Sequence, residues 1–219
     1  KLAAARTATG TGMTELHARG EDTLRSLGLK PLLWVAGRLT ALLPVSQPVL
    51  LAGPGASRRL GETLAGFGHR RIMIVTDRVV AGLGLHDGLV AALGAGGIEH
   101  VLYDGISADA PIPEVEHGIA IYRERACDAL IAVGGGSPMD AAKVIASAVA
   151  NRKPPRKLVG YFKGLRAPAP VYAVPTTAGT GSEVTVAAII SDRAEGRKYL
   201  VADSLHAADQ HVGYLQAAC

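Results

Sequence analysis

The stretch Ala129–Ala150 reads ALIAVGGGSPMDAAKVIASAVA and predicts the fold of this chain. Its first five residues form an apolar run that is long enough for a buried strand. Three consecutive glycines, Gly134, Gly135 and Gly136, then predict a sharp turn with no side chain to obstruct an approaching group. The alanine-rich remainder has strong helix formers and an apolar face. We therefore expect a strand, a glycine turn and a helix.

The beginning of this helix has the residues of a well-capped N-terminus. Ser137 is the expected N-cap, Pro138 suits the first helical position, and Asp140 completes a start that is similar to a capping box. A helix N-terminus offers free N–H groups and a partial positive charge, so an anion can bind there. An ordinary tight turn without a ligand is the alternative on this stretch alone.

A second stretch supports the ligand-binding interpretation. Val171–Val174 is another short apolar run, and the sequence PTTAGTGSEVT follows it at residues 175–185. Its hydroxyl groups and glycines suit the oxygens of sugars and phosphates. The sequence GGGSPMDAAK at residues 134–143 together with this second stretch resembles the iron-dependent (group III) alcohol dehydrogenase family. The resemblance runs from about residue 48 to about residue 201.

The whole chain alternates strand patterns with helix patterns, which implies an α/β fold with a Rossmann-like, doubly wound parallel sheet. Apolar runs predict strands at residues 48–52, 72–76, 100–103, 129–133 and 171–174. Helical patterns fall at residues 57–66, 85–93, 112–126 and 137–150. A β-hairpin is expected near the C-terminus, from residues 185–190 to residues 199–201. The segment 151–168 is basic and proline-containing, and we expect an exposed connection there.

Parallel sheets bind ligands beyond the carboxyl ends of their strands. Asp77, the 134–137 turn and the 176–182 segment all follow predicted strands, so they can converge on one cleft. The resemblance implies that this cleft holds NAD. Asp77 would bind the adenine ribose and favour NAD over NADP. The resemblance implies that Gly135, Gly136 and Ser137 lie against the pyrophosphate. Thr176, Thr177 and Thr180 would bind the adenine and phosphate side. Thr185 and Ala187 would lie near the nicotinamide, and Lys198 near its ribose.

Simpler structural roles remain open for several of these residues. Asp77 alone is equally compatible with a loop residue that caps the next segment, and Lys198 with a solvated side chain beside a hairpin. Asp140 and Lys143 match the family motif, but capping and surface roles suffice for them. Asp109 departs from the family, which usually has Asn followed by Pro at this point.

The resemblance also implies a second, all-helical domain in which one Asp and three His bind a divalent metal, iron or zinc. The metal would act as a Lewis acid on the alcohol oxygen. We expect no metal ligand and no catalytic residue within this chain, because His206 and His211 have neither the spacing of a same-face pair nor the family context. The chain is therefore expected to be truncated before that helical domain.

The predicted organisation has three parts. Residues 1–46 form an N-terminal extension with one amphipathic helix at 31–43, residues 47–203 form the NAD-binding α/β domain, and residues 204–219 form an atypical, truncated tail. The formal charge of +4 is dispersed and only 4% of the residues are aromatic, so no nucleic-acid partner is expected. No membrane partner is expected either. Two cysteines, Cys127 and Cys219, make no disulfide framework and fit a reducing, cytoplasmic location.

The function that the resemblance implies is hydride transfer between NAD and a small alcohol or aldehyde, and we expect the chain alone to be inactive. Two alternatives stay open. One is a non-catalytic fragment that only binds the nucleotide. The other is a related reaction, such as that of a maleylacetate reductase or a hydroxyacid–oxoacid transhydrogenase. Assembly into a homo-oligomer is left open by the sequence.

Overall fold

The computed structural model describes residues 50–185, 187–202 and 214–216. By its internal contacts the chain divides into the units Lys1–Pro44 and Val45–Cys219, and every described residue belongs to the second unit. The helix predicted at 31–43 and most of the predicted 204–219 tail lie outside the described residues. The domain boundaries expected from the sequence therefore stay predictions.

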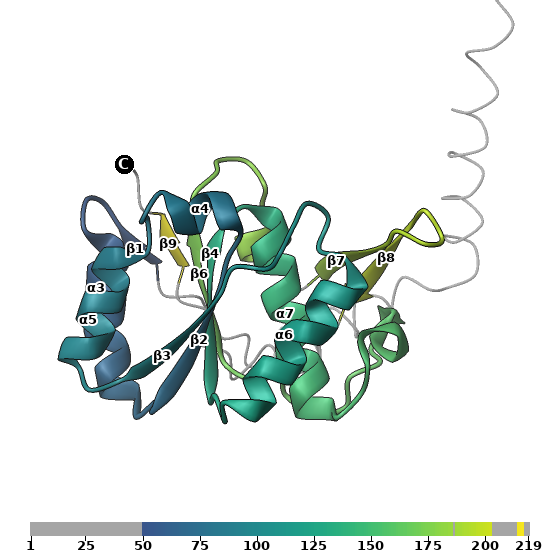
Figure 1. The fold of residues 1–219 in the computed structure, drawn as a ribbon, viewed down its shortest axis with the longest axis horizontal. Coiled ribbons are helices and arrows are strands. Elements are labelled where there is room, and N and C mark those ends of the chain that lie inside the picture. The colour runs from purple at the N-terminus through teal and green to yellow at the C-terminus, as the bar shows by residue number, and fades with distance from the viewer. Residues whose placement is uncertain (1–49, 186, 203–213, 217–219) are drawn as a thin grey trace, which may run out of the picture. The chain divides into compact units, whose positions relative to one another are not determined.

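Strands and helices alternate along the described chain as the sequence predicts (Figure 1). The larger sheet and its helices comprise β1 (Leu50–Ala52), α3 (Ala56–Leu64), η1 (Ala65–Phe67), β2 (Arg71–Val75), α4 (Arg78–Gly82), α5 (Asp87–Ala95), β3 (Glu99–Tyr103), α6 (Ile112–Glu124), β4 (Ala129–Gly134), α7 (Gly136–Asn151), β6 (Val171–Pro175) and β9 (Tyr214–Gln216). The remaining elements are η2 (Pro155–Leu158), β5 (Gly160–Tyr161), η3 (Ser182–Val184), β7 (Ala187–Asp192) and β8 (Arg197–Ala202).

The larger sheet has the strand order β1-β9-β6-β4-β2-β3, and its neighbouring strands are parallel. This confirms the predicted α/β fold with a parallel, doubly wound sheet. The short helix α4 and the strand β9 have no counterpart in the sequence-based prediction. β9 lies between β1 and β6, and comes from the part of the chain for which the sequence predicts only an atypical tail.

The direction of winding reverses between β2 and β4. From β2 the chain moves outward to the edge strand β3, and it then returns to the other side of β2 to form β4 and β6. The helices α3 and α5 cover one face of the sheet, and α6 and α7 cover the other (Figure 1). Ligands of open α/β sheets bind at such a reversal, beyond the carboxyl ends of the strands.

The side chains of the central strands alternate between two cores. Met73 and Leu130 pack with α6 and α7, whereas Ile72 and Ile131 pack with α3 and α5. This alternation follows from the two-residue period of a strand. All six residues of β4 are buried, which is expected for a parallel strand that has helices on both sides.

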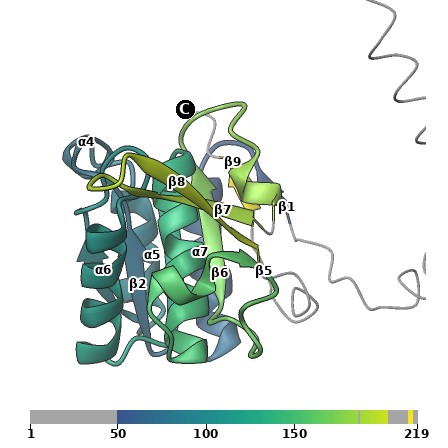
Figure 2. The same cartoon turned by 90° about the vertical axis from the view of Figure 1, so that its right-hand side faces the viewer.

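A smaller sheet with the order β5-β8-β7 joins the first through α7. β7 and β8 form an antiparallel pair, which confirms the predicted hairpin, and Figure 2 shows the pair lying across α7. Ala188 and Ile190 of β7 belong to the same core as α6 and α7. The exposed connection predicted at 151–168 is partly wrong, because Pro155 and Leu158 are buried and η2 packs on α7.

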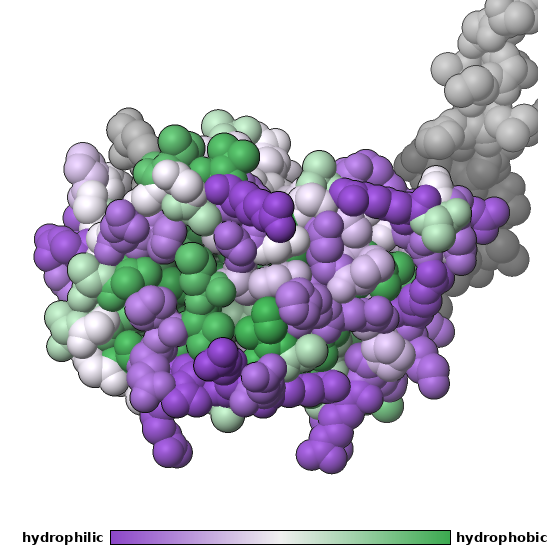
Figure 3. All heavy atoms as spheres, viewed as in Figure 1, coloured by the Kyte–Doolittle hydropathy of each residue, from purple (hydrophilic) through white to green (hydrophobic). Residues whose placement is uncertain are grey.

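The surface of this unit is mixed in polarity. Figure 3 shows polar side chains over much of one face, with an apolar area on the side of α5 and β3. β3 is an edge strand of the sheet and leaves Leu102 exposed. Within the described residues, no helix has the length and apolar character needed to cross a membrane.

Candidate functional site

A pocket of about 710 Å³ opens where β2, β3, β4 and β6 end. Its walls come from the segments that follow these four strands. Six of the ten residues predicted to bind the cofactor line it, namely Asp77, Gly135, Gly136, Ser137, Thr176 and Thr177. The pocket thus lies at the reversal between β2 and β4, and the expected convergence of the strand ends on one cleft is confirmed for these six residues.

The glycine turn between β4 and α7 has to be free of side chains. Gly134 has a φ of 148°, and a Cβ there would lie 2.8 Å from Pro138 Cγ. A Cβ on Gly135 would lie 3.0 Å from Thr177 Oγ1, across the space between the turn and β6. The N–H groups of Gly136 and Ser137 belong to the first helical turn and have no intrahelical acceptor. The turn therefore forms a narrow cradle that presents N–H donors and the positive end of a helix dipole.

Three details of the predicted helix start are wrong. Pro138 is the third residue of α7 and not the first. The N-cap of α7 is Gly135, and Ser137 lies inside the helix, where its Oγ accepts a hydrogen bond at 3.0 Å from the N–H of Asp109. Asp140 does not close a capping box. Its carboxylate instead accepts hydrogen bonds from Ser182 Oγ and, at 2.9 Å, from the N–H of Ile189. Both side chains reach partners on distant segments, which local capping rules do not anticipate.

Asp77 lines the pocket beside the glycine turn. It is the N-cap of α4, and its Oδ1 accepts hydrogen bonds of 2.9 Å from the N–H groups of Val79 and Val80. The simpler role, a loop residue that caps the next segment, is therefore present. It uses one carboxylate oxygen. Oδ2 lies on the side of the glycine turn, 3.6 Å from the position that a Cβ of Gly134 would take.

Two arginines that the sequence analysis missed also line the pocket. Arg78 follows Asp77, and Arg193 comes from the turn of the β7–β8 hairpin. Arg193 Nη2 donates a hydrogen bond of 2.7 Å to Ser107 Oγ, and the N–H of Ser107 donates one of 2.7 Å to Glu114 Oε2. Arg193 Nη1 also lies 3.9 Å from Glu114 Oε1, so this cation is paired with an acidic side chain of the same pocket. Nothing in the local sequence around residue 193 could have indicated this, because the hairpin reaches the pocket only through its packing on α6 and α7.

The other four predicted residues lie outside the pocket lining. Thr180 donates a hydrogen bond of 3.0 Å to Glu183 Oε2, in the segment between β6 and η3. Thr185 follows η3, and Ala187 is the first residue of β7. Lys198, on β8, donates a hydrogen bond of 2.7 Å to Asp109 Oδ1. These residues extend from the pocket toward the hairpin, and whether they contact a cofactor stays a prediction.

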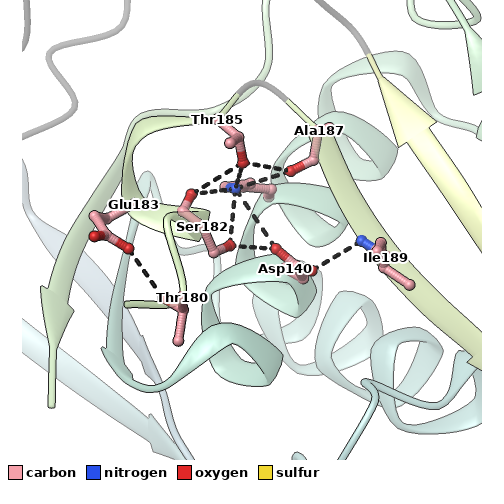
Figure 4. A network of polar contacts seen from close by, with 8 residues as sticks. Asp140, Thr180, Ser182, Glu183, Thr185, Ala187 and Ile189 are labelled. Carbon is pink, nitrogen blue, oxygen red and sulfur yellow. Dashed lines mark hydrogen bonds and ion pairs between the residues drawn. The ribbon is translucent and has the colours of Figure 1, made fainter. Parts of the chain in front are cut away.

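Lys143 and Asp140 form a charged pair on α7, with 3.5 Å between Nζ and Oδ1. Figure 4 shows Asp140 close to Ser182 and Ile189. The side chains of Lys143 and Asp140 are only 21% and 16% exposed, so the surface role expected for Lys143 is wrong. Burial lowers the pKa of the Lys143 ammonium, although the Asp140 and Glu183 carboxylates act in the opposite direction. The spacing of three residues between an acid and a base on one helix was a signal for this pair.

Within residues 50–185, 187–202 and 214–216, no three His, Cys, Asp or Glu side chains gather into a set that could hold a metal ion. His206 and His211 lie outside the described residues. The described residues therefore do not fit a divalent metal.

The reversal of the sheet, the glycine cradle and the acidic residue beside it define a Rossmann-like α/β protein. Residues 48–211, most of the chain, match the family model described as iron-containing alcohol dehydrogenase. The chain belongs to the iron-containing alcohol dehydrogenase family.

The similar proteins are oxidoreductases that act on small molecules according to their names. Lactaldehyde reductase of Escherichia coli (strain K12) is 33% identical over 155 residues, which cover 69% of this chain and 40% of that protein. A crystal structure of 1,3-propanediol oxidoreductase superimposes with a TM-score of 0.70 and 30% identity, over 77% of this chain and 44% of that one.

Sulfoacetaldehyde reductase from Bifidobacterium kashiwanohense, crystallised in complex with NAD+, superimposes with a TM-score of 0.66 and 27% identity. The matched region covers 78% of this chain and 45% of that structure. In each of these comparisons the chain spans less than half of the matched protein.

Proposed function

We propose that this chain binds NAD in the pocket and supplies the cofactor half of an NAD-dependent alcohol dehydrogenase. The observation that carries the proposal is that Asp77 lines the same pocket as the glycine cradle at the N-terminus of α7. A carboxylate can accept hydrogen bonds from both hydroxyls of a ribose, and a helix N-terminus binds phosphate. A dinucleotide presents these two groups together.

The cradle supports this assignment by its chemistry. A Cβ on Gly135 would lie 3.0 Å from Thr177 Oγ1, so a side chain there would displace Thr177, which lines the same pocket. We assign Gly135, Gly136 and Ser137 to the pyrophosphate, and Thr176, Thr177 and Thr180 to the adenine and phosphate side. Thr185 and Ala187 are assigned to the nicotinamide, and Lys198 to its ribose.

A small alcohol or aldehyde is the proposed substrate class. The names of the similar proteins support it, since they refer to lactaldehyde, 1,3-propanediol and sulfoacetaldehyde. The divalent metal, iron or zinc, that the family resemblance implies has no ligand set among the described residues. A reducing, cytoplasmic compartment is part of the proposal, because Cys127 is a buried free thiol.

The second candidate function is nucleotide binding without chemistry. The lack of a metal ligand set within the described part of the chain favours it. We accordingly expect the 219-residue chain to bind NAD without oxidising alcohols. The check is to add ferrous or zinc ion, NAD and short alcohols and to follow NADH. Metal-dependent turnover above background would show that the chain itself supplies the ligands, and it would remove this second candidate.

Calorimetric titration of the full chain with NAD tests the binding proposal. Gly135→Val fills the cradle, and we expect at least about tenfold weaker binding. Gly94→Val is the matched control, because a Cβ on Gly94 of α5 meets nothing within 4 Å. Equal NAD affinity of the folded Gly135→Val variant and the wild type would refute a nucleotide site at this turn.

A further inference from the structure

The Lys143–Asp140 pair connects α7 to the segment that carries Thr185 and Ala187. Lys143 Nζ donates to the carbonyl oxygen of Ser182, to Ser182 Oγ at 3.1 Å, to Thr185 Oγ1 at 3.2 Å and to the carbonyl oxygen of Ala187 at 3.0 Å. One ammonium group therefore contacts η3, the residue after it and the first residue of β7. Figure 4 shows these acceptors converging from one side of the helix.

Asp140 holds the same segment by a second set of contacts. Its Oδ1 accepts a hydrogen bond from Ser182 Oγ and lies 3.5 Å from Lys143 Nζ, and its Oδ2 accepts one of 2.9 Å from the N–H of Ile189. The segment from Ser182 to Ile189 is thus tied to α7 at both ends. The hydroxyl of Thr185 also donates to the carbonyl oxygen of Ala187 at 3.1 Å, which shapes the backbone between them.

Joining a loop to a helix through a charged pair costs free energy. Two ions taken out of water lose hydration energy, and apolar residues of similar volume often stabilise a protein as well or better. What charge-assisted hydrogen bonds add is directional geometry. Because Lys143 is bonded to backbone carbonyls as well as hydroxyls, the pair specifies the path of the backbone from residue 182 to residue 187.

The position of the pair on the helix relates this path to the pocket. α7 begins at Gly136, in the cradle, and Lys143 lies seven residues further along, or about 10 Å by the rise of an α-helix. One rigid helix therefore presents N–H donors to the pocket at its N-terminus and holds the 182–187 segment two turns later.

We propose that Lys143 is a positioning residue for the nicotinamide half of the cofactor. It holds the backbone of residues 182–187 so that Thr185 and Ala187 face the nicotinamide, and it has no part in holding the adenine ribose or the phosphates. This inference rests on the proposed NAD-binding function. It predicts that loss of the ammonium group weakens binding of the nicotinamide half and leaves binding of the adenine half unchanged.

Titration of the full chain with NAD and with ADP-ribose, which lacks the nicotinamide, tests this separation. Lys143→Met keeps the length of the side chain and removes the charge. We expect about tenfold weaker NAD binding, because the 182–187 backbone beside the nicotinamide is no longer held, and ADP-ribose binding within about twofold of the wild type. Lys157→Met is the control, because Lys157 is exposed in η2, and both ligands should bind it as they bind the wild type.

Three results of these titrations would contradict the inference. Equal weakening of NAD and ADP-ribose would mean that Lys143 only stabilises the fold, and unchanged affinities would mean that it positions nothing, so either result overturns the inference. If the wild type binds neither ligand, the proposed function fails and the inference with it. Should Lys143→Met not fold, Ser182→Ala removes hydroxyl contacts to both charges and leaves the pair in place. That variant should weaken NAD selectively and to a smaller extent.

Discussion

Lys198 Nζ donates a hydrogen bond of 2.7 Å to Asp109 Oδ1, and this contact joins β8 to the loop before α6. The N–H of Asp109 donates in turn to Ser137 Oγ at 3.0 Å. Asp109 therefore touches both the hairpin and the first turn of α7. Its φ of 66° lies in the left-handed region, as does that of Ala110 at 44°. The carboxylate of Asp109 is thus a partner of the Lys198 ammonium group.

Replacement of Asp109 by Asn tests how much this ion pair contributes to stability. Asn tolerates left-handed backbone and has the same shape, so Asp109→Asn removes only the charge. The two side chains are 59% and 53% exposed, which limits an ion pair to about 0.2–1 kcal/mol. We expect urea unfolding to show a loss of stability within that range, and the loss should shrink at high salt. A larger loss that does not depend on salt would refute the assignment of the effect to this pair.

Asp77→Ser tests the ribose contact without removal of the helix cap. Serine is also a good N-cap, so α4 should keep its bonds to the N–H groups of Val79 and Val80. A charged hydrogen bond contributes about 1.5–3 kcal/mol. We expect NAD affinity to fall by about tenfold or more, and NADP to bind closer to NAD than it does in the wild type. If calorimetry gives unchanged affinities for both cofactors, Asp77 is only the cap of α4.

Gly134→Ala should destabilise the fold at the turn itself. A side chain at a φ of 148° is strained, and the new Cβ would lie 2.8 Å from Pro138 Cγ. We expect a loss of about 1–3 kcal/mol in the free energy of unfolding, measured by urea titration. Gly94→Ala is the matched control and should raise stability by about 0.5–1 kcal/mol, because its site is an open helical position. Similar stabilities for the two variants would contradict the geometry of the turn.

His69 should make stability depend on pH below neutrality. Its side chain is 12% exposed, and its Nε2 lies 2.8 Å from the Tyr172 hydroxyl oxygen. Burial lowers the pKa of His69, while Asp128 acts in the opposite direction with a smaller effect. The unfolded chain therefore binds a proton near pH 6.5 that the folded chain binds only at lower pH, so stability falls as pH decreases through this window.

Replacement of His69 by Gln isolates this contribution. Urea unfolding of the wild type should show a larger loss of stability between about pH 7.5 and about pH 5.5 than unfolding of His69→Gln. His100→Gln serves as the control, because His100 is exposed on the edge strand β3, and it should follow the wild type. An equal pH dependence of His69→Gln and the wild type would show that another group is responsible.

The sequence by itself determined the units of the fold. β4, the glycine turn and α7 are fixed by interactions between residues close in the chain: an apolar run that must be buried, glycines that accept an unusual backbone, and helix formers with one apolar face. The same local rules indicate that Asp77 and the 176–177 threonines follow strands. Because parallel strands end at one edge of a sheet, their convergence could be predicted before any coordinates were known.

Only the tertiary structure decided which polar groups meet. Lys198 and Asp109 are 89 residues apart in the chain, Lys143 and Thr185 are 42 apart, and Ser137 and Asp109 are 28 apart. Local propensity treats Ser137 as a cap and Lys143 as a surface residue, because it contains no information on what packs against them. The hairpin of β7 and β8 lies across α7 because Ala188 and Ile190 join the core formed by α6 and α7. That burial brings carbonyl and carboxylate oxygens from distant parts of the chain within reach of these side chains. No short stretch of sequence specifies such partners.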